Sequence, residues 1–159
     1  MKAIFLESER LILKPLSLSF LSQEYLNWMN DSDVNEFLSS GGDYSIDKLK
    51  KFLIEVEKKD MLFWAICIKN ESKHIGNIKI DPVEIKDGIC EYGIMMGDKT
   101  EWGKGFAKEA SKLVIEFCFK ILNLRKMNLG VIESNKRAVH LYEKLDFITE
   151  GHLIKHVSS

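Results

Sequence analysis

Apolar positions in the first sixty residues recur mostly at helical spacing. Arg10 to Lys14 is short and aliphatic, which predicts a strand that ends at Pro15. From Ser19 to Leu38 large apolar residues recur every three or four positions, and Asn30-Asp31 interrupts them. This pattern predicts two short helices with Asx caps. Ser45 is the expected N-cap of a third helix that extends through Lys58.

The middle of the chain reads as strands. Leu62 to Ile68 is apolar on both faces, as a central strand should be, and Ile75 to Asp81 alternates more. Asn70 to Lys73 between them predicts a hairpin turn. Ile89 to Met96 is a further apolar strand. These segments predict an antiparallel meander.

The last third alternates helices with strands. A polar, glycine-bearing loop from Lys99 to Ala107 leads into an amphipathic helix expected from Gly105 to Leu122. A strand from Lys126 to Ile132, a helix capped by Asn135 and ending near Leu145, and a strand from Phe147 to Val157 are expected next. The order predicts one α/β fold (α+β, with a mixed sheet), with crossover helices in its later part.

Composition narrows the class of protein. The chain has 159 residues, 45% of them hydrophobic, and a net charge of −1, which argues for one folded domain over residues 1–159 rather than disorder. The charge balance gives no footprint for nucleic-acid binding. No apolar run is long enough to span a bilayer, and the acidic residues near the N-terminus argue against an export signal. We therefore expect neither a nucleic-acid nor a membrane partner.

Cysteine and histidine patterns predict no metal site. Cys67, Cys90 and Cys118 are odd in number and widely spaced, which fits neither a disulfide framework nor a zinc pattern. Each lies in an apolar segment, where a free thiol behaves as a small hydrophobe. Unpaired cysteines favour a reducing, cytoplasmic location.

The most informative segment is the loop at the junction between the third predicted strand of the meander and the long helix. Small residues at Gly103, Gly105 and Ala107 would let a ligand approach the backbone, and the first amides of the helix have no internal partners. These groups and the helix dipole favour a phosphate or diphosphate, and Lys104 could add charge at the rim. The loop fits neither a Walker A motif nor a dinucleotide fingerprint. On the glycines alone, a turn without a ligand is an equal alternative.

Three segments resemble the GNAT superfamily of N-acetyltransferases. Trp102-Gly-Lys-Gly-Phe-Ala-Lys-Glu-Ala110 is similar to the family's acetyl-CoA loop, particularly in its RimJ/RimL-like branch, although Trp102 stands where Gln or Arg is usual. Asn135-x-x-Ala-x-x-Leu-Tyr142-x-x-x-Asp146-Phe is similar to a second family motif, with Asp146 in place of glycine. The opening Glu7-x-x-Arg-Leu-Ile-Leu-Lys-Pro-Leu resembles the branch's first strand.

The resemblance implies a fold and a cosubstrate. The expected architecture is a central, mostly antiparallel sheet with a splayed strand pair, flanked by helices. Acetyl-CoA would bind through Trp102, Gly103, Lys104, Gly105, Phe106 and Ala107. Its pantetheine arm would lie along Ile94, Met95 and Met96, although the two methionines would also suit a core. The family usually has a further strand after the one expected at 147–157; here that strand is expected to be truncated, replaced by a partner chain, or absent.

The resemblance also implies direct attack of an amine on the thioester, which needs a base and an acid. Glu91 is the candidate base, because an acid in an apolar strand should be desolvated and because several members of the family carry a glutamate base at this position. An ion pair with a lysine across the sheet is the alternative, and Glu133 and Glu109 are lesser candidates. Glu109 is expected to serve the start of its helix.

Tyr142 is the candidate acid, since the family's tyrosine at this position points at the CoA sulfur; an ordinary half-buried tyrosine is the alternative. Asn135 would hydrogen-bond the pantetheine arm, cap its helix, or both.

The acceptor is expected to be a primary amine. Residues 20–58 should line the acceptor side, where acids would suit a cationic amine, or where they are merely solvated. A small amine such as an amino sugar, or a protein N-terminus, is as far as the sequence leads. A non-catalytic acyl-CoA-binding or sensing module is the rival interpretation. The exposed end of the sheet would suit a homodimer.

Overall fold

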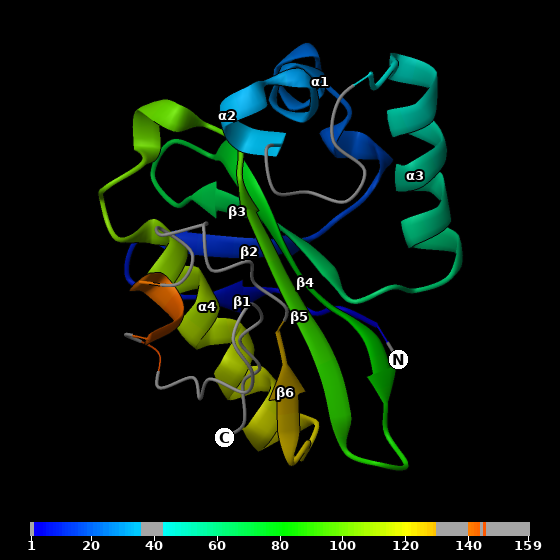
Figure 1. The fold of residues 1–159 in the computed structure, drawn as a ribbon, viewed down its shortest axis with the longest axis vertical. Helices are drawn as coiled ribbons and strands as arrows, with labels where there is room; N and C mark the ends of the chain where they lie inside the picture. The colour runs from blue at the N-terminus through cyan, green and yellow to red at the C-terminus, as the bar shows by residue number, and fades with distance from the viewer. Residues whose placement is uncertain (1, 36–42, 130–139, 144, 146–159) are drawn as a thin grey trace.

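A six-stranded sheet forms the centre of the computed structural model, which describes residues 2–35, 43–129, 140–143 and 145 (Figure 1). Its strands follow one another in chain order, and their bounds are β1 Leu6–Glu7, β2 Leu11–Pro15, β3 Phe63–Ile68, β4 Lys73–Glu84, β5 Ile89–Met96 and β6 Lys126–Asn128. Neighbouring strands from β1 to β5 are antiparallel, and β6 pairs with β5 in parallel. The predicted meander and mixed sheet are confirmed.

Helices cover the sheet on two sides. The 3₁₀ turn Leu18–Phe20 and the helices α1 Gln23–Asn30, α2 Ser32–Asn35 and α3 Ile46–Lys58 lie together at one end of the molecule (Figure 1). Helix α4, Phe106–Glu116, lies beside the strands further down. The predicted break at Asn30-Asp31 is confirmed, and Ser45 caps α3 by accepting a hydrogen bond from the Lys48 amide.

The alternating side chains of the strands fill two cores. Leu11, Leu13, Trp64 and Ile66 point to the side of α4, where they join its buried residues. Ala65 and Cys67, the alternate residues of β3, pack with α1 and α3 on the other side. This two-sided burial explains why β3 is apolar throughout, as the sequence predicted. The three cysteines are free and buried, as expected.

Several boundaries differ from the prediction. Helix α4 gives way at Phe117 to a π-helical turn, Phe117–Ile121, so the expected helix to Leu122 is α-helical only as far as Glu116. Strand β4 runs on to Glu84 beyond the expected Asp81, with an irregular register against β5 between Ile80 and Val83. The predicted strand at 147–157 lies outside the described residues. None of the helices in the described ranges is long and apolar enough to cross a membrane.

Candidate active site

The glycine loop connects the end of β5 to α4. After the 3₁₀ turn Lys99–Glu101, Gly103 and Gly105 have φ angles of +80° and +83°, and Phe106 is the first residue of α4. These angles lie in the left-handed region, where L side chains are strained, so this path of the chain requires glycine at both positions. A Cβ atom at Gly103 would have no neighbour within 4 Å, which leaves open space on that side of the loop.

The amides of this loop lack acceptors within the described part of the chain. The last paired amide before the loop is that of Trp102, which donates to the Lys99 carbonyl, and the next is that of Glu109, which donates to the Gly105 carbonyl. Gly105 is the N-cap residue of α4 and supplies no side-chain cap. The amides from Gly103 to Lys108 therefore remain available for an anion at the positive end of the helix.

Strands β5 and β6 are paired only along the first part of β5. Their pairing covers Ile89 to Glu91 against Lys126 to Asn128, and β5 continues to Met96 without a described neighbour on that edge. The Ile80 amide donates to the Leu62 carbonyl, so the main-chain groups of Ile80 face β3 and not β5. Ile80 is paired with Tyr92 in the register of β4 and β5, and main-chain groups alternate in direction along a strand. The main-chain groups of Tyr92, Ile94 and Met96 therefore point away from β4. Within the described residues, the main-chain groups of Ile94 and the amide of Met96 have no partner on this edge, so an amide-bearing ligand can use them.

The side chain of Trp102 connects the glycine loop to the end of the β5 edge. Its indole Nε1 donates to the Met96 carbonyl at 2.9 Å. Of the expected pantetheine residues, Met95 packs into the core beside α1 and α3, whereas Ile94 and Met96 pack on the α4 side. The main-chain groups of Ile94 are therefore the open ones at the middle of the edge, while the Met96 carbonyl is engaged by Trp102.

Tyr142 lies near the point at which β5 and β6 separate. Residues 140–143 are helical, and the Tyr142 ring meets the Tyr92 ring edge-on, with centroids 5.7 Å apart. Tyr142 is buried, and this burial raises the pKa of its phenol well above the usual value, so the hydroxyl holds its proton. The strand from Tyr92 to Met96 is about 13 Å long. The Tyr142 phenol, beside Tyr92, and the glycine loop, beyond Met96, therefore lie far enough apart for an extended chain such as a pantetheine arm to lie between them.

Tyr92 is a site residue that the sequence analysis did not single out. Its hydroxyl and that of Ser111 are within hydrogen-bonding distance, and Ser111 Oγ donates to the Ala107 carbonyl at 2.7 Å. Because Ser111 uses its proton for Ala107, Tyr92 is the donor in the first bond. This chain ties the middle of β5 to the first turn of α4. The signal in the sequence was the position of Tyr92, which shares the inward-facing side of β5 with Cys90 and Ile94.

Glu91 lies elsewhere than expected. Its side chain is exposed, and its neighbours Cys90 and Tyr92 are buried toward α4, so Glu91 points to the opposite face of β5 from Tyr142. The expected desolvation is therefore wrong: strand alternation carries Glu91 to a part of the sheet that the helices leave uncovered. In the described residues Glu91 forms no ion pair with a lysine across the sheet either.

The acids expected on the acceptor side are partly engaged. Lys99 Nζ lies 2.8 Å from Asp31 and 3.0 Å from Asp33, and the hydrogen bond from Lys99 lowers the pKa of Asp31. Trp28 is buried in the core between α1 and the sheet. These contacts favour the interpretation in which the aromatic residues of this region belong to the core and its acids are ordinary surface groups, rather than a site prepared for a cationic amine. Asn135 and Glu133 lie outside the described residues.

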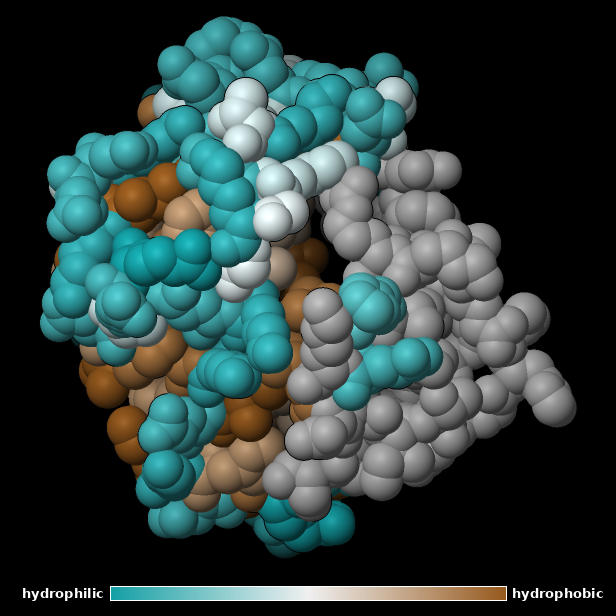
Figure 2. All heavy atoms as spheres, turned by 90° about the vertical axis from the view of Figure 1, so that its left-hand side faces the viewer, coloured by the Kyte–Doolittle hydropathy of each residue, from teal (hydrophilic) through white to brown (hydrophobic). Residues whose placement is uncertain are grey.

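The described elements are thus arranged for an extended, anionic ligand. Within the described residues, amides without acceptors lie at one end of β5, the main-chain groups of Ile94 lie along its edge, and a protonated phenol lies near the other end. Figure 2 shows a hollow in the side of the molecule that carries α4, with hydrophobic residues at its floor and residues of mixed hydropathy along the described part of its rim.

Comparison with known proteins identifies the fold family. Residues 10–148 match the model of the acetyltransferase (GNAT) domain. The chain belongs to the GNAT family. This match spans the glycine loop, the divergence of β5 and β6, and the helix that carries Tyr142, so the GNAT resemblance noted in the sequence is confirmed.

Individual relatives narrow the comparison. The chain is 36% identical over 81 residues to a spermidine N(1)-acetyltransferase of Vibrio cholerae, covering 51% of this chain and 46% of that protein. It is 32% identical over 111 residues to an uncharacterized N-acetyltransferase from a Bacillus subtilis prophage, covering 70% and 62%. The GNAT chain thus matches about half to three fifths of the length of these relatives.

The fold is shared with solved structures. A spermidine N-acetyltransferase of Vibrio cholerae in complex with CoA and spermine superposes with a TM-score of 0.81 at 24% identity, covering 95% of this chain and 94% of that one. At this identity the likeness establishes the shared GNAT fold.

Proposed function

We propose that the protein is an acetyl-CoA-dependent N-acetyltransferase that acts on a primary amine. The observation that carries the proposal is the run of amides from Gly103 to Lys108, at and before the start of α4, which have no acceptor in the described part of the chain. A diphosphate fits this cradle, because both glycines open the backbone to a ligand and the helix dipole favours negative charge. The bound thioester would supply the acyl group for direct transfer to the amine.

Residues of the chain take distinct parts in this proposal. Trp102 to Ala107 hold the diphosphate, and the main-chain groups of Ile94 and the amide of Met96 bind the pantetheine arm, with Asn135 as a further partner. Tyr142 donates its proton to the departing thiolate, a role for which a buried, protonated phenol is suited.

Glu91 takes the proton of the amine, either directly or through water. Its exposure supports the second route, since an exposed carboxylate is in contact with solvent.

The acceptor class rests on relatives. The spermidine N(1)-acetyltransferase match favours a small polyamine as the first candidate. The loop sequence from Trp102 to Ala110 favours the RimJ/RimL-like branch, which adds amino sugars and protein N-termini. The test is turnover with a panel of these amines, with CoA release followed by a thiol reagent and products identified by mass spectrometry. The chain's own cysteines are buried, which keeps their background low.

The panel also separates the enzyme from the rival interpretation. Acetylated product from at least one amine, in proportion to released CoA, is the expected result. CoA binding without product from any amine would favour the non-catalytic acyl-CoA sensor instead. Absence of both binding and turnover would remove the basis of the proposal.

A further inference from the structure

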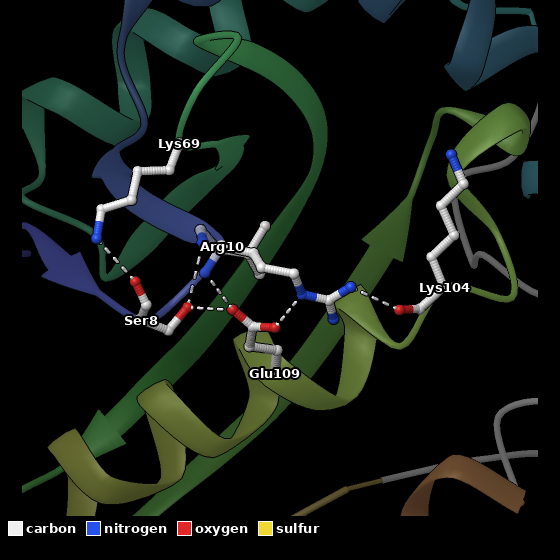
Figure 3. A network of polar contacts seen from close by, with 6 residues as sticks. Ser8, Arg10, Lys69, Lys104 and Glu109 are labelled. Carbon is white, nitrogen blue, oxygen red and sulfur yellow. Dashed lines mark hydrogen bonds and ion pairs between the residues drawn. The ribbon is translucent and has the colours of Figure 1, made fainter.

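A polar connection joins the turn between β1 and β2 to the glycine loop (Figure 3). Arg10 Nε donates to Glu109 Oε1 at 2.7 Å, and Arg10 Nη1 donates to the Lys104 carbonyl at 2.9 Å. The other oxygen of Glu109 accepts from Ser8 Oγ at 2.5 Å and from the Arg10 amide at 2.9 Å. The guanidinium also lies over the Phe106 ring, 4.3 Å from its centroid. One arginine therefore contacts the loop, the first residue of α4 and its first full turn.

The bond to Lys104 determines how the next amide points. In a trans peptide the carbonyl of one residue and the amide of the next point in opposite directions. Arg10 holds the Lys104 carbonyl toward the β2 side, so the Gly105 amide points away from Arg10, and this amide has no acceptor in the described residues. A rotated peptide would present a carbonyl oxygen to the diphosphate instead, and two like partial charges would then face each other.

The same contacts also occupy and neutralise the carboxylate of Glu109. A carboxylate in the first turn of α4 would ordinarily accept from the free amides of its own helix or repel an anion bound there. Here both of its oxygens are engaged by Ser8 and Arg10, and the positive charge of Arg10 balances its own. Glu109 lies in the first turn of α4, as expected for an acid that serves the start of its helix. Its bonds cross to the β1–β2 turn, so it occupies none of the helix amides among the described residues.

We infer that Arg10 and Glu109 are positioning residues of the diphosphate-binding loop, which they hold with the Gly105 amide directed at the ligand and without a competing carboxylate. The inference rests on the proposed function, namely that this loop binds the diphosphate of CoA. Neither residue touches the reacting atoms, so their effect is on the affinity for the acyl carrier rather than on the chemical step.

The test compares CoA with pantetheine, which lacks the diphosphate. Dissociation constants for both are measured by calorimetry for the wild type, Arg10→Met, Arg10→Lys and Glu109→Gln. We expect Arg10→Met to weaken CoA binding about tenfold or more, because it removes hydrogen bonds from a charged donor, and to leave pantetheine binding unchanged. Arg10→Lys keeps the charge but cannot bond Lys104 and Glu109 in one planar fork, so an intermediate loss is expected.

Matched controls lie close by. Lys69 bonds the Ser8 carbonyl at 3.0 Å on the same turn without touching Lys104 or Glu109, and Glu116 pairs with Lys120 later along α4. Lys69→Met and Glu116→Gln should bind CoA as the wild type does. In the enzyme assay Arg10→Met should raise KM for acetyl-CoA and leave kcat within about twofold.

Each result decides between distinct outcomes. Equal CoA affinity in the wild type, Arg10→Met and Glu109→Gln would overturn the inference and leave the proposed function standing. Equal weakening of CoA and pantetheine would also overturn it, since that pattern means general disruption of the fold. A wild type that does not bind CoA would refute the proposed function itself.

Discussion

Substitution of Gly105 by valine tests the glycine loop directly. A β-branched residue at φ +83° is a steric outlier, and a left-handed conformation costs an ordinary L residue about 1–2 kcal/mol. A Cβ at this position also reaches to 3.4 Å from Arg10 Nη2. The loop of the variant should therefore relax to a negative φ and turn the amides at the start of α4 away from the ligand.

The size of the effect follows from the strain. CoA must restore the strained path when it binds, which at about 2 kcal/mol lowers affinity about 30-fold. At a CoA concentration of about 100 times the wild-type Kd, ligand stabilisation falls from about 2.7 to about 0.9 kcal/mol. In a chain of this size that corresponds to a decrease in the CoA-induced rise of Tm from about 5–11 °C to about 2–4 °C.

Thermal unfolding with and without CoA measures this difference, and Gly88→Ala is the control. Gly88 also has a positive φ, +69°, but lies in the hairpin before β5, where a Cβ would meet Arg125. The control should lower Tm of the free protein and keep the full CoA-induced rise. A Gly105→Val variant that folds and retains the whole wild-type rise would refute the reasoning.

Three further predictions concern single side chains. Tyr142→Phe should lower kcat by roughly 10²–10⁴ and leave the affinity for CoA unchanged, and a kcat that the substitution does not change at any pH would exclude the acid role. Because burial raises the pKa of this phenol, ionisation of Tyr142 should cause no loss of kcat in the wild type up to about pH 10. Glu91→Gln should lower kcat/KM by roughly 10²–10⁴, and a variant that keeps the wild-type kcat/KM would show that another group is the base. Burial alone would raise the pKa of Glu109, but hydrogen bonds from Ser8 and Arg10 outweigh this effect and hold the pKa below its usual value. The contribution of Glu109 to stability is therefore present at neutral pH and is lost as pH falls through the folded-state pKa. The difference in Tm between the wild type and Glu109→Gln should therefore shrink from pH 7 toward pH 3, whereas a constant difference would contradict this linkage.

Much of the fold could be predicted because its signals are local. The Asn30-Asp31 break, the Ser45 cap and the bounds of β5 depend on residues next to one another in the chain, and all three are confirmed. The π-helical turn after Glu116 could not be predicted, because it continues the same apolar periodicity as α4 and differs only in which carbonyl each amide meets. The extension of β4 past Asp81 depends on its partner strands rather than on its own sequence.

The candidate site divides in the same way. Gly103 and Gly105 were identifiable because only glycine readily adopts their backbone conformation, and Tyr142 because a motif marks it. The surroundings of Glu91 were mispredicted because apolar neighbours in a strand say nothing about which face a helix covers.

The sequence by itself determined the elements, their order and the glycines that an anion cradle requires, since these follow from backbone sterics and hydrophobic spacing. Only the tertiary structure decided that Arg10 and Glu109, 99 residues apart, meet beside that cradle, and that Glu91 and Tyr142 lie on opposite faces of the sheet. The physical reason is that the direction of a side chain and the partner of a carboxylate depend on which distant elements pack together, and this packing is a property of the whole folded chain.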